Sequence, residues 1–358
     1  MNINLMAPIN QLGYGIAGLN ILKALQKQCT VSLFPIGQPQ VTTEEDHNHV
    51  KFAIEKARFF DAKAPCIKIW HQNDMSQFVG KGEHIGFPIF ELDVFDELEQ
   101  HHLNSCDRLF VCSEWAKQTV KNNLSAFSRT KRQIGDGKPI DVIPLGVDTN
   151  IFKPTPYIDG GKTIFFNCGK WEIRKGHDFL IKAFKIVAEE FENVELWMMC
   201  SNPFNSQEEN LRWQQLYNHP KVKLIPRAET QAEVYNVMSQ VSCGVFPSRA
   251  EGWNLELLEM MACGKSVITT GYAAHTEFCT KENSNIIPID STESAFDGKW
   301  FFNQGNWAKI GEKEISSLVD LMKNVIKSGN KTNISGIETA QRFSWDNSAA
   351  KILKSLDQ

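Results

Sequence analysis

Glu251 and Glu259 are the residues whose spacing most directly suggests chemistry, because seven residues separate them in a segment that crosses from a strand into a helix. The pattern predicts a strand ending at Phe246 and a helix that begins at Trp253–Asn254 and stops at Gly264. Glu251 then falls in the loop before the helix, and Glu259 falls on the helix, about two helical turns along from Glu251. Two carboxylates are therefore expected near one helix start.

The start of this helix is itself a candidate binding site. Unpaired backbone N–H groups near Asn254 and Leu255 would form an anion site by their geometry and by the helix dipole. Glu251 could then reach sugar hydroxyls, the helix start could hold a phosphate, and Glu259 could accept hydrogen bonds from ribose hydroxyls. For Glu259 alone, an ordinary carboxylate on a helix surface is the alternative.

A glycine-bracketed basic loop runs from Gly169 to Gly176 between another predicted strand and helix, and it carries Lys170, Arg174 and Lys175. Lysine and arginine there can neutralise a diphosphate, and glycine lets the backbone approach it closely. A solvated basic turn is the alternative.

A second glycine loop, Gly13–Gly18, has the GxGxxG pattern between a strand and a helix, with Gly13 and Gly15 as candidate donor-binding positions. A dinucleotide-binding fingerprint would also have an acidic residue about 20 positions on, to hold the ribose. The second predicted strand instead ends in Phe34–Gly37, which contains no carboxylate, so a dehydrogenase is disfavoured. The open alternatives are glycines that allow a helix to pack on a sheet and a backbone-lined loop facing a phosphate or an acceptor.

The first half of the chain offers weaker candidates. His71 follows a predicted strand and is either a catalytic or binding residue or a structural histidine, and Glu91 follows another strand. A local basic stretch could bind anionic lipid or a polyanionic acceptor, although a solvated helix and loop is the favoured interpretation. The stretch comprises Lys117, Lys121, Arg129, Lys131 and Arg132.

These residues need strands and helices to hold them, and short apolar runs alternate with amphipathic stretches along nearly the whole chain. Strands separated by helices predict doubly wound parallel sheets, hence an α/β protein of two Rossmann-like domains. We expect domains at 1–150 and 160–340, with a C-terminal helix at 341–358 packing back on the first. Ligands in such sheets bind at the carboxyl ends of the strands, so a central cleft between the two domains is the expected site.

The segment PSRAEGWNLELLEMMACGKSVITT resembles the signature of retaining glycosyltransferases of family 4, which have the GT-B fold. The resemblance extends to GKWEIRKGHDF, VIPLGVDTNIFKP, CSEWAKQTV and FSWDNSAAKIL, and so covers most of the chain. It implies transfer of a sugar from a nucleotide diphosphate sugar to an acceptor hydroxyl with retention of configuration. It also implies that no metal and no other cofactor is needed.

Carried over by position, the resemblance implies that Lys170 and Lys175 contact the donor diphosphate, that Glu251 binds the donor sugar near the reacting carbon, and that Glu259 binds the ribose. His71 stands where the family often has a histidine in the cleft, so it would contact the donor or the acceptor. Arg174 is expected to bind the donor as part of the basic loop. Lys170 stands where the family usually has arginine, which keeps the charge but loses bidentate geometry. Trp253 and Asn254 stand where it usually has Phe-Gly, so sugar specificity does not carry over, whereas backbone contacts at Asn254 and Leu255 should survive.

Composition and charge bear on which other classes of protein remain possible. The formal charge is 38 minus 42, or −4, which gives no electrostatic reason for a nucleic-acid partner. Nine scattered cysteines without a CxxC pair, and no apolar run of about 18 residues, predict a cytoplasmic protein with reduced thiols and no transmembrane segment. The expected acceptor is a glycan, a lipid-linked molecule or a small molecule. A GT-B phosphorylase or epimerase, and a catalytically silent nucleotide-sugar-binding or scaffold protein, stay open as alternatives.

Overall fold

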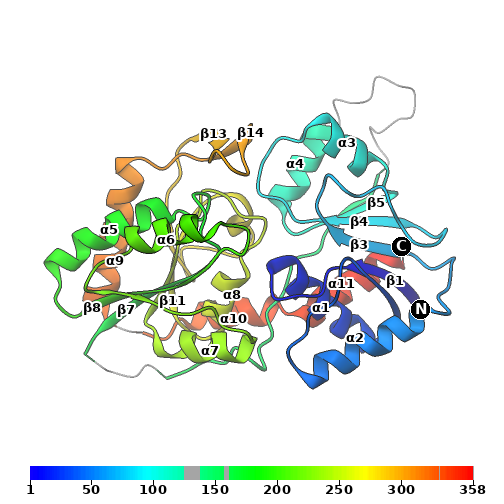
Figure 1. The fold of residues 1–358 in the computed structure, drawn as a ribbon, viewed down its shortest axis with the longest axis horizontal. Helices are drawn as coiled ribbons and strands as arrows, with labels where there is room; N and C mark the ends of the chain where they lie inside the picture. Colours follow the sequence, from blue (N-terminus) through cyan, green and yellow to red (C-terminus); the bar gives the residue numbers. More distant parts are fainter. Residues whose placement is uncertain (125–137, 157–160, 330, 358) are drawn as a thin grey trace. The chain divides into compact units, whose positions relative to one another are not determined.

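The computed structural model describes residues 1–124, 138–156, 161–329 and 331–357. By contacts, the chain divides into two units, one made of residues 1–146 with 343–358 and the other of residues 147–342. Each unit contains one six-stranded sheet whose strands are all parallel. The predicted α/β class with two Rossmann-like sheets is therefore confirmed (Figure 1).

The sheet of the first unit has the strand order β2-β1-β3-β4-β5-β6, in which the chain changes direction across the sheet after β2. Its elements are β1 (Asn2–Ala7), α1 (Gly13–Gln26), β2 (Thr30–Pro35), α2 (Glu44–Ala57), β3 (Cys66–Trp70), β4 (His84–Pro88), α3 (Glu97–Asn104), β5 (Arg108–Val111), α4 (Glu114–Leu124), β6 (Ile140–Val142) and α11 (Trp345–Leu356).

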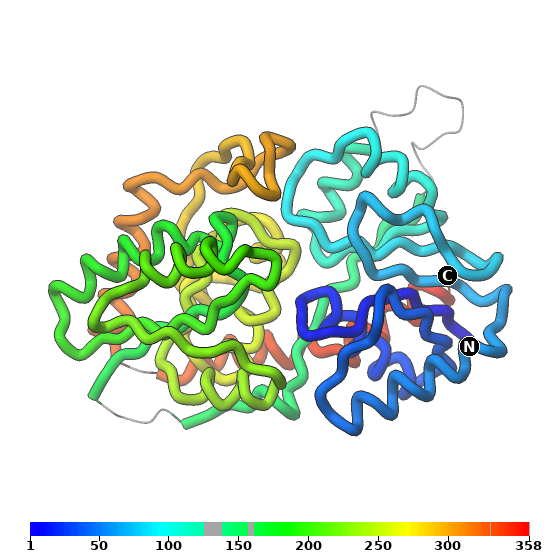
Figure 2. The backbone as a smooth tube through the Cα atoms, viewed as in Figure 1, coloured from blue at the N-terminus to red at the C-terminus, as the bar shows by residue number. Residues whose placement is uncertain are grey.

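Helix α11 closes the first unit although it is the last element of the chain, as Figure 2 shows where the red segment returns beside the blue one. Lys27 at the end of α1 pairs with Asp346 at 2.7 Å, and the Ser348 hydroxyl donates to the Pro144 carbonyl at 2.6 Å. At Gly146 an added Cβ would lie 2.2 Å from the Trp345 backbone nitrogen, so only glycine lets the two segments pass.

The sheet of the second unit has the order β12-β11-β10-β7-β8-β9, and α5 packs against α9 while α8 packs against α10. Its elements are β7 (Thr163–Gly169), α5 (His177–Glu190), β8 (Val194–Cys200), α6 (Gln207–Leu216), β9 (Val222–Leu224), α7 (Gln231–Gln240), β10 (Cys243–Phe246), α8 (Leu255–Ala262), β11 (Ser266–Thr270), the 3₁₀ helix η2 (Ala273–Glu277), β12 (Asn285–Ile287), the hairpin β13 (Thr292–Phe296) and β14 (Phe302–Ala308), α9 (Glu312–Ser328) and α10 (Ile334–Arg342).

Polar side chains cap several helix starts. Helix α3 begins at Glu97, since the Asp96 side chain accepts from the Glu99 backbone N–H and Glu99 reaches back to the Asp96 N–H. Likewise the Ser344 side chain accepts from the Asn347 N–H, so α11 begins at Trp345.

Candidate functional site

The basic loop after β7 is held against the loop after β10 by glycine-dependent turns. Gly169 has φ 141° and Gly176 has φ 76°, both in the region that side chains disfavour. A Cβ at Gly176 would lie 2.1 Å from the Pro247 carbonyl oxygen, so glycine is required for the approach. The Arg249 N–H also donates to the Arg174 carbonyl at 2.7 Å, which fixes the two loops side by side.

A buried network of charges joins these loops at Glu251. Arg174 donates to Glu251 Oε2 at 2.9 Å, to Glu172 Oε2 at 2.7 Å and to the Ala250 carbonyl at 2.8 Å. Lys175 Nζ lies 2.8 Å from Glu251 Oε1, the same oxygen that accepts from the Ser248 hydroxyl at 2.8 Å. Both oxygens of Glu251 are therefore held in fixed positions.

The network keeps Glu251 ionised although only 4% of the residue is exposed. Burial alone would raise the pKa of its carboxyl, but Lys175 and Arg174 outweigh burial and hold the pKa below its ordinary value. The pKa of Lys175 is in turn raised, because Glu251 and Glu256 outweigh the effect of burial on the ammonium. The site thus places one carboxylate between two permanent cations.

Lys170 and Arg174 have different surroundings although both belong to the basic loop. The Lys170 side chain is 38% exposed, with Nζ 2.9 Å from Glu172 and 5.6 Å from the centre of the Phe204 ring. It can therefore turn toward a ligand, whereas the Arg174 side chain is 5% exposed and is positioned to orient Glu251 and Glu172. The predicted contact of Arg174 with the donor stays a prediction.

The start of α8 lies where the sequence placed it. The helix begins at Leu255, and Asn254 is its N-cap residue in the left-handed conformation, with φ 84° and ψ 79°. The Asn254 side-chain oxygen accepts from the Leu257 N–H at 3.2 Å and so caps one N–H group of the first turn. N–H groups at the start of a helix point outward along the helix axis. Trp253 is buried against Phe278, with the ring centres 4.9 Å apart, so it anchors the turn.

Glu259 is buried, contrary to the alternative of a surface helix carboxylate. It lies on α8, and no side-chain partner holds its carboxylate among the residues that the structure describes. Burial, and then the neighbouring Glu256, raises its pKa well above the ordinary value. A buried carboxyl with no side-chain partner in the described part of the chain is suited to receive a hydroxyl of a bound molecule.

The first unit carries the remaining predicted residues. Gly15 is required for packing, because an added Cβ would lie 2.3 Å from Asn10 Oδ1, whereas nothing lies within 4 Å of a Cβ at Gly13. The packing alternative therefore accounts for Gly15. Tyr14, inside this glycine motif, has its ring centre 4.6 Å from that of His71 and 5.8 Å from that of Trp70.

This aromatic group lies after β1 and at the end of β3, where the parallel strands have their carboxyl ends. The Tyr14 hydroxyl donates to the Ile89 carbonyl, and burial followed by the charge of Glu91 raises the Tyr14 pKa. His71 itself is exposed. Of the predicted basic stretch, Lys117 and Lys121 lie on α4, and Arg129, Lys131 and Arg132 fall outside the described residues.

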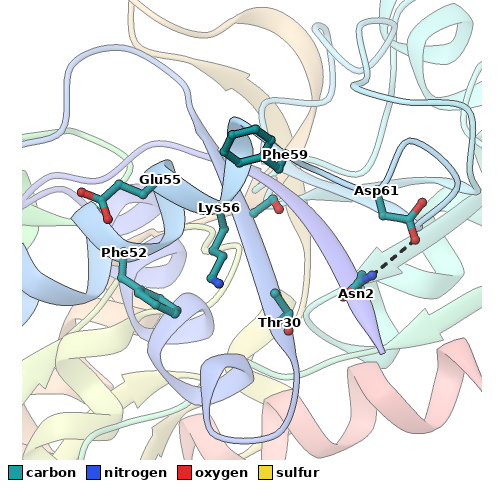
Figure 3. A pocket seen from close by; sticks show the side chains of 8 residues that line it. Asn2, Thr30, Phe52, Glu55, Lys56, Phe59 and Asp61 are labelled. Carbon is teal, nitrogen blue, oxygen red and sulfur yellow. Dashed lines mark hydrogen bonds between the residues drawn. The ribbon is translucent and has the colours of Figure 1, made fainter.

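A cavity of about 410 Å³ is formed at the amino-terminal ends of β1 and β2. Figure 3 shows the side chains that line it, among them Phe52, Lys56 and Phe59, and the hydrogen bond between Asn2 and Asp61. It contains none of the predicted site residues. The buried charges around Glu251 are the stronger candidate site, because strongly perturbed titratable groups gather at functional sites.

Two further features bear on cofactors and membranes. Within residues 1–124, 138–156, 161–329 and 331–357, no three histidine, cysteine, aspartate or glutamate side chains are grouped so that they could hold a metal ion. Across the same described residues, no helix combines the length and the apolar character needed to cross a bilayer.

Sequence reasoning missed three residues of this site: Glu172, Glu256 and His275. Glu172 stood inside the basic loop, where its pairing with Arg174 depends on how the loop curls. Glu256 lies in the first turn of α8 and contributes to the shifted pKa values of Lys175 and Glu259. His275 lies on η2 with its ring against Asn254, and no local pattern in the sequence signals that contact.

Comparisons with known proteins bear on the family and the fold. Residues 162–297 match the family model described as Glycosyl transferases group 1. Sucrose-phosphate synthase from Thermosynechococcus elongatus has a TM-score of 0.69 and 16% identity, over 100% of this chain and 98% of that one. Anabaena HepE in complex with UDP-glucose has a TM-score of 0.70 and 15% identity, over 100% and 99% of the chains.

A third structure was solved in a study of "enzymatic glycosyltransfer with retention" by trehalose-6-phosphate synthase. It has a TM-score of 0.65 and 10% identity, over 99% of both chains. None of the curated protein sequences matches the chain. The structural similarities confirm the predicted GT-B fold.

Proposed function

We propose that the protein transfers a sugar from a nucleotide diphosphate sugar to an acceptor hydroxyl, because residues 162–297 match the Glycosyl transferases group 1 family model in a chain of GT-B fold. One observation carries the proposal: the carboxylate of Glu251, held ionised by Lys175 and Arg174, lies three residues before the capped start of α8. A carboxylate that could contact the sugar and a helix start that could hold a phosphate therefore belong to one short segment.

The donor is proposed to bind in the second unit. Lys170 and Lys175 would contact the diphosphate, which would also receive hydrogen bonds from the first N–H groups of α8. Glu259 would accept from the ribose hydroxyls, which is supported by its buried carboxyl with no described side-chain partner. HepE was solved with UDP-glucose, and this supports a UDP-sugar as the first donor to test.

In the proposed reaction the bond between the anomeric carbon and the diphosphate oxygen breaks while the acceptor oxygen attacks the same face of the sugar. The leaving diphosphate takes the acceptor proton, and its growing negative charge is stabilised by Lys170, Lys175 and the start of α8. Retention is supported by the study of trehalose-6-phosphate synthase named above. No metal ion is assigned a role, because the two lysines and the helix start supply positive potential, and no protein group is named as the base.

The acceptor is proposed to contact the first unit. The Tyr14–His71 group at the carboxyl ends of β1 and β3 supplies an aromatic surface and an exposed imidazole. A glycan, a lipid-linked molecule and a small molecule all present suitable hydroxyls. A cytoplasmic location is part of the proposal, supported by nine cysteines that are all free thiols.

Thermal unfolding with UDP, GDP, ADP and their sugar conjugates tests the proposal. A ligand at about 100 times its Kd should stabilise the protein by about 2.7 kcal/mol. The Lys175→Ala variant should lose this stabilisation. Lys162→Ala is the control and should retain it, because Lys162 forms an exposed ion pair with Glu195. If no nucleotide or nucleotide sugar shifts the transition at millimolar concentration, donor binding is wrong.

A further inference from the structure

The backbone at Asn254 adopts a conformation that glycine accepts more readily than any other residue. Its φ of 84° lies in the left-handed region, where asparagine is the most tolerated residue with a side chain. Asparagine adds an amide that glycine lacks, and the Oδ1 atom of this amide caps the Leu257 N–H at 3.2 Å. The amide can do this only in one of its two flipped orientations.

His275 selects that orientation. Asn254 Nδ2 lies 2.9 Å from His275 Nε2, and both residues are buried, His275 completely. An amide NH₂ group can only donate, so this contact requires Nε2 to accept. With Nδ2 held by the ring, Oδ1 is directed toward Leu257.

The other ring nitrogen shows why Nε2 is free to accept. His275 Nδ1 lies 3.1 Å from the Thr270 carbonyl and 2.9 Å from the Thr269 hydroxyl. The Thr269 hydroxyl already donates to the Phe246 carbonyl at 3.1 Å, so it accepts from the ring. Nδ1 therefore carries the proton, and the neutral imidazole presents an acceptor to Asn254.

The 3₁₀ helix η2 also braces the same loop through its backbone, since the Ala274 N–H donates to the Glu251 carbonyl at 3.2 Å. The charged groups that act on the His275 ring are Glu251, Lys175 and Arg174. Burial is the largest influence and lowers the His275 pKa to about 4, so the ring stays neutral at physiological pH. A protonated ring would turn Nε2 into a donor facing an NH₂ group and would break the arrangement.

We propose that His275 is a positioning residue for donor binding: it fixes the Asn254 amide, and through it the first turn of α8 that receives the diphosphate. The structural half of this inference stands by itself, and the ligand half rests on the proposed function. Two variants separate the acceptor from the ring. His275→Gln keeps an acceptor oxygen near the position of Nε2, whereas His275→Phe keeps a ring and removes the acceptor.

Calorimetric titration with UDP tests the ligand half. His275→Phe should weaken UDP binding by about ten-fold, the size of a lost helix cap, and His275→Gln should retain most of the affinity. Asn254→Gly tolerates the left-handed backbone and has no amide to orient. In that background His275→Phe should therefore cost less than about two-fold. The same ten-fold loss in both backgrounds would overturn the inference, and so would a His275→Phe variant that binds like the wild type.

Amide hydrogen exchange of the ligand-free protein tests the structural half. The Leu257 N–H should exchange faster in His275→Phe than in the wild type, and His275→Gln should restore its protection. Equal Leu257 exchange in all three proteins would overturn the positioning role. If the wild type does not bind UDP but the exchange pattern appears, the positioning role stands and the proposed donor is wrong.

Discussion

Lys175 lies 2.8 Å from Glu251, and this ion pair is inside the protein: 11% of the lysine side chain and 6% of the glutamate side chain are exposed. Arg174 approaches the other oxygen of the same carboxylate. A buried carboxylate between two cations is costly to assemble and is retained where its charge and position have a use. In this chain that use is proposed to be contact with a donor sugar.

The first prediction concerns the stability of this group. Glu251→Gln removes the negative charge but leaves Lys175 and Arg174 buried, so the free energy of unfolding should fall by about 3 kcal/mol. Urea denaturation measures this. Glu208→Gln is the matched control, because its pair with Arg212 is exposed on α6 and should contribute less than about 1 kcal/mol. Equal effects of the two variants would contradict a site whose stability depends on the Glu251 charge.

The second prediction concerns the two lysines. Lys170→Ala should weaken nucleotide diphosphate binding by roughly ten-fold, since one charge-assisted hydrogen bond is lost. Lys170→Arg should retain or improve the affinity, because the side chain is exposed enough to turn and a guanidinium binds phosphate in a bidentate manner. Calorimetry at fixed ionic strength measures both. Unchanged affinity in Lys170→Ala would remove Lys170 from the donor site.

The third prediction tests Glu259 with a matched ligand. The wild type should bind UDP about ten-fold more tightly than an analogue that lacks both ribose hydroxyls, because the buried carboxyl then has no partner. Glu259→Ala should bind the two ligands equally. If this variant still discriminates between them, the ribose contact lies elsewhere.

The fourth prediction follows from two buried histidines. Burial lowers the pKa of His177 to about 3 and that of His275 to about 4. The unfolded chain, with histidine pKa values near ~6.5, then binds more protons, so the free energy of unfolding falls as the pH decreases from about 6.5 to about 4. Between pH 7 and pH 5 each histidine should account for on the order of 2 kcal/mol.

His275→Gln isolates one of these contributions. The decrease in unfolding free energy between pH 7 and pH 5 should be smaller in this variant than in the wild type. The difference should equal the contribution of one histidine, on the order of 2 kcal/mol. Chemical denaturation at the two pH values measures the difference. An identical decrease in both proteins would mean that His275 titrates normally in the folded state.

The strongest sequence patterns predicted both the sheets and the local structure around Glu251. Strand ends, glycines and the helix start are local features, so the segment from Phe246 to Gly264 was predicted nearly as it folds. Helix α2 was not predicted, because only Val50 and Ala53 of its residues are buried and its apolar stripe is correspondingly weak. The β13–β14 hairpin was also missed, since Phe296 and Phe302 are exposed and break the usual alternation.

Contacts between residues distant in sequence could not be predicted from one chain. Asn254 and His275 are 21 positions apart, and their contact depends on the path of β11 and η2. The buried state of Glu259 depends on how α8 packs in the second unit. Each is a consequence of tertiary packing, which leaves no spacing rule in the sequence.

The most direct test of the proposed transfer is the release of UDP from UDP-glucose, measured by chromatography with water as the acceptor and then with a panel of glycans. Wild-type protein should release UDP in proportion to enzyme concentration, and Glu251→Gln should lower the rate at least about 100-fold while retaining UDP binding. A wild type that binds UDP-, GDP- or ADP-sugars at saturation but releases no nucleotide from any of them would contradict the account, and would identify a silent nucleotide-sugar-binding protein.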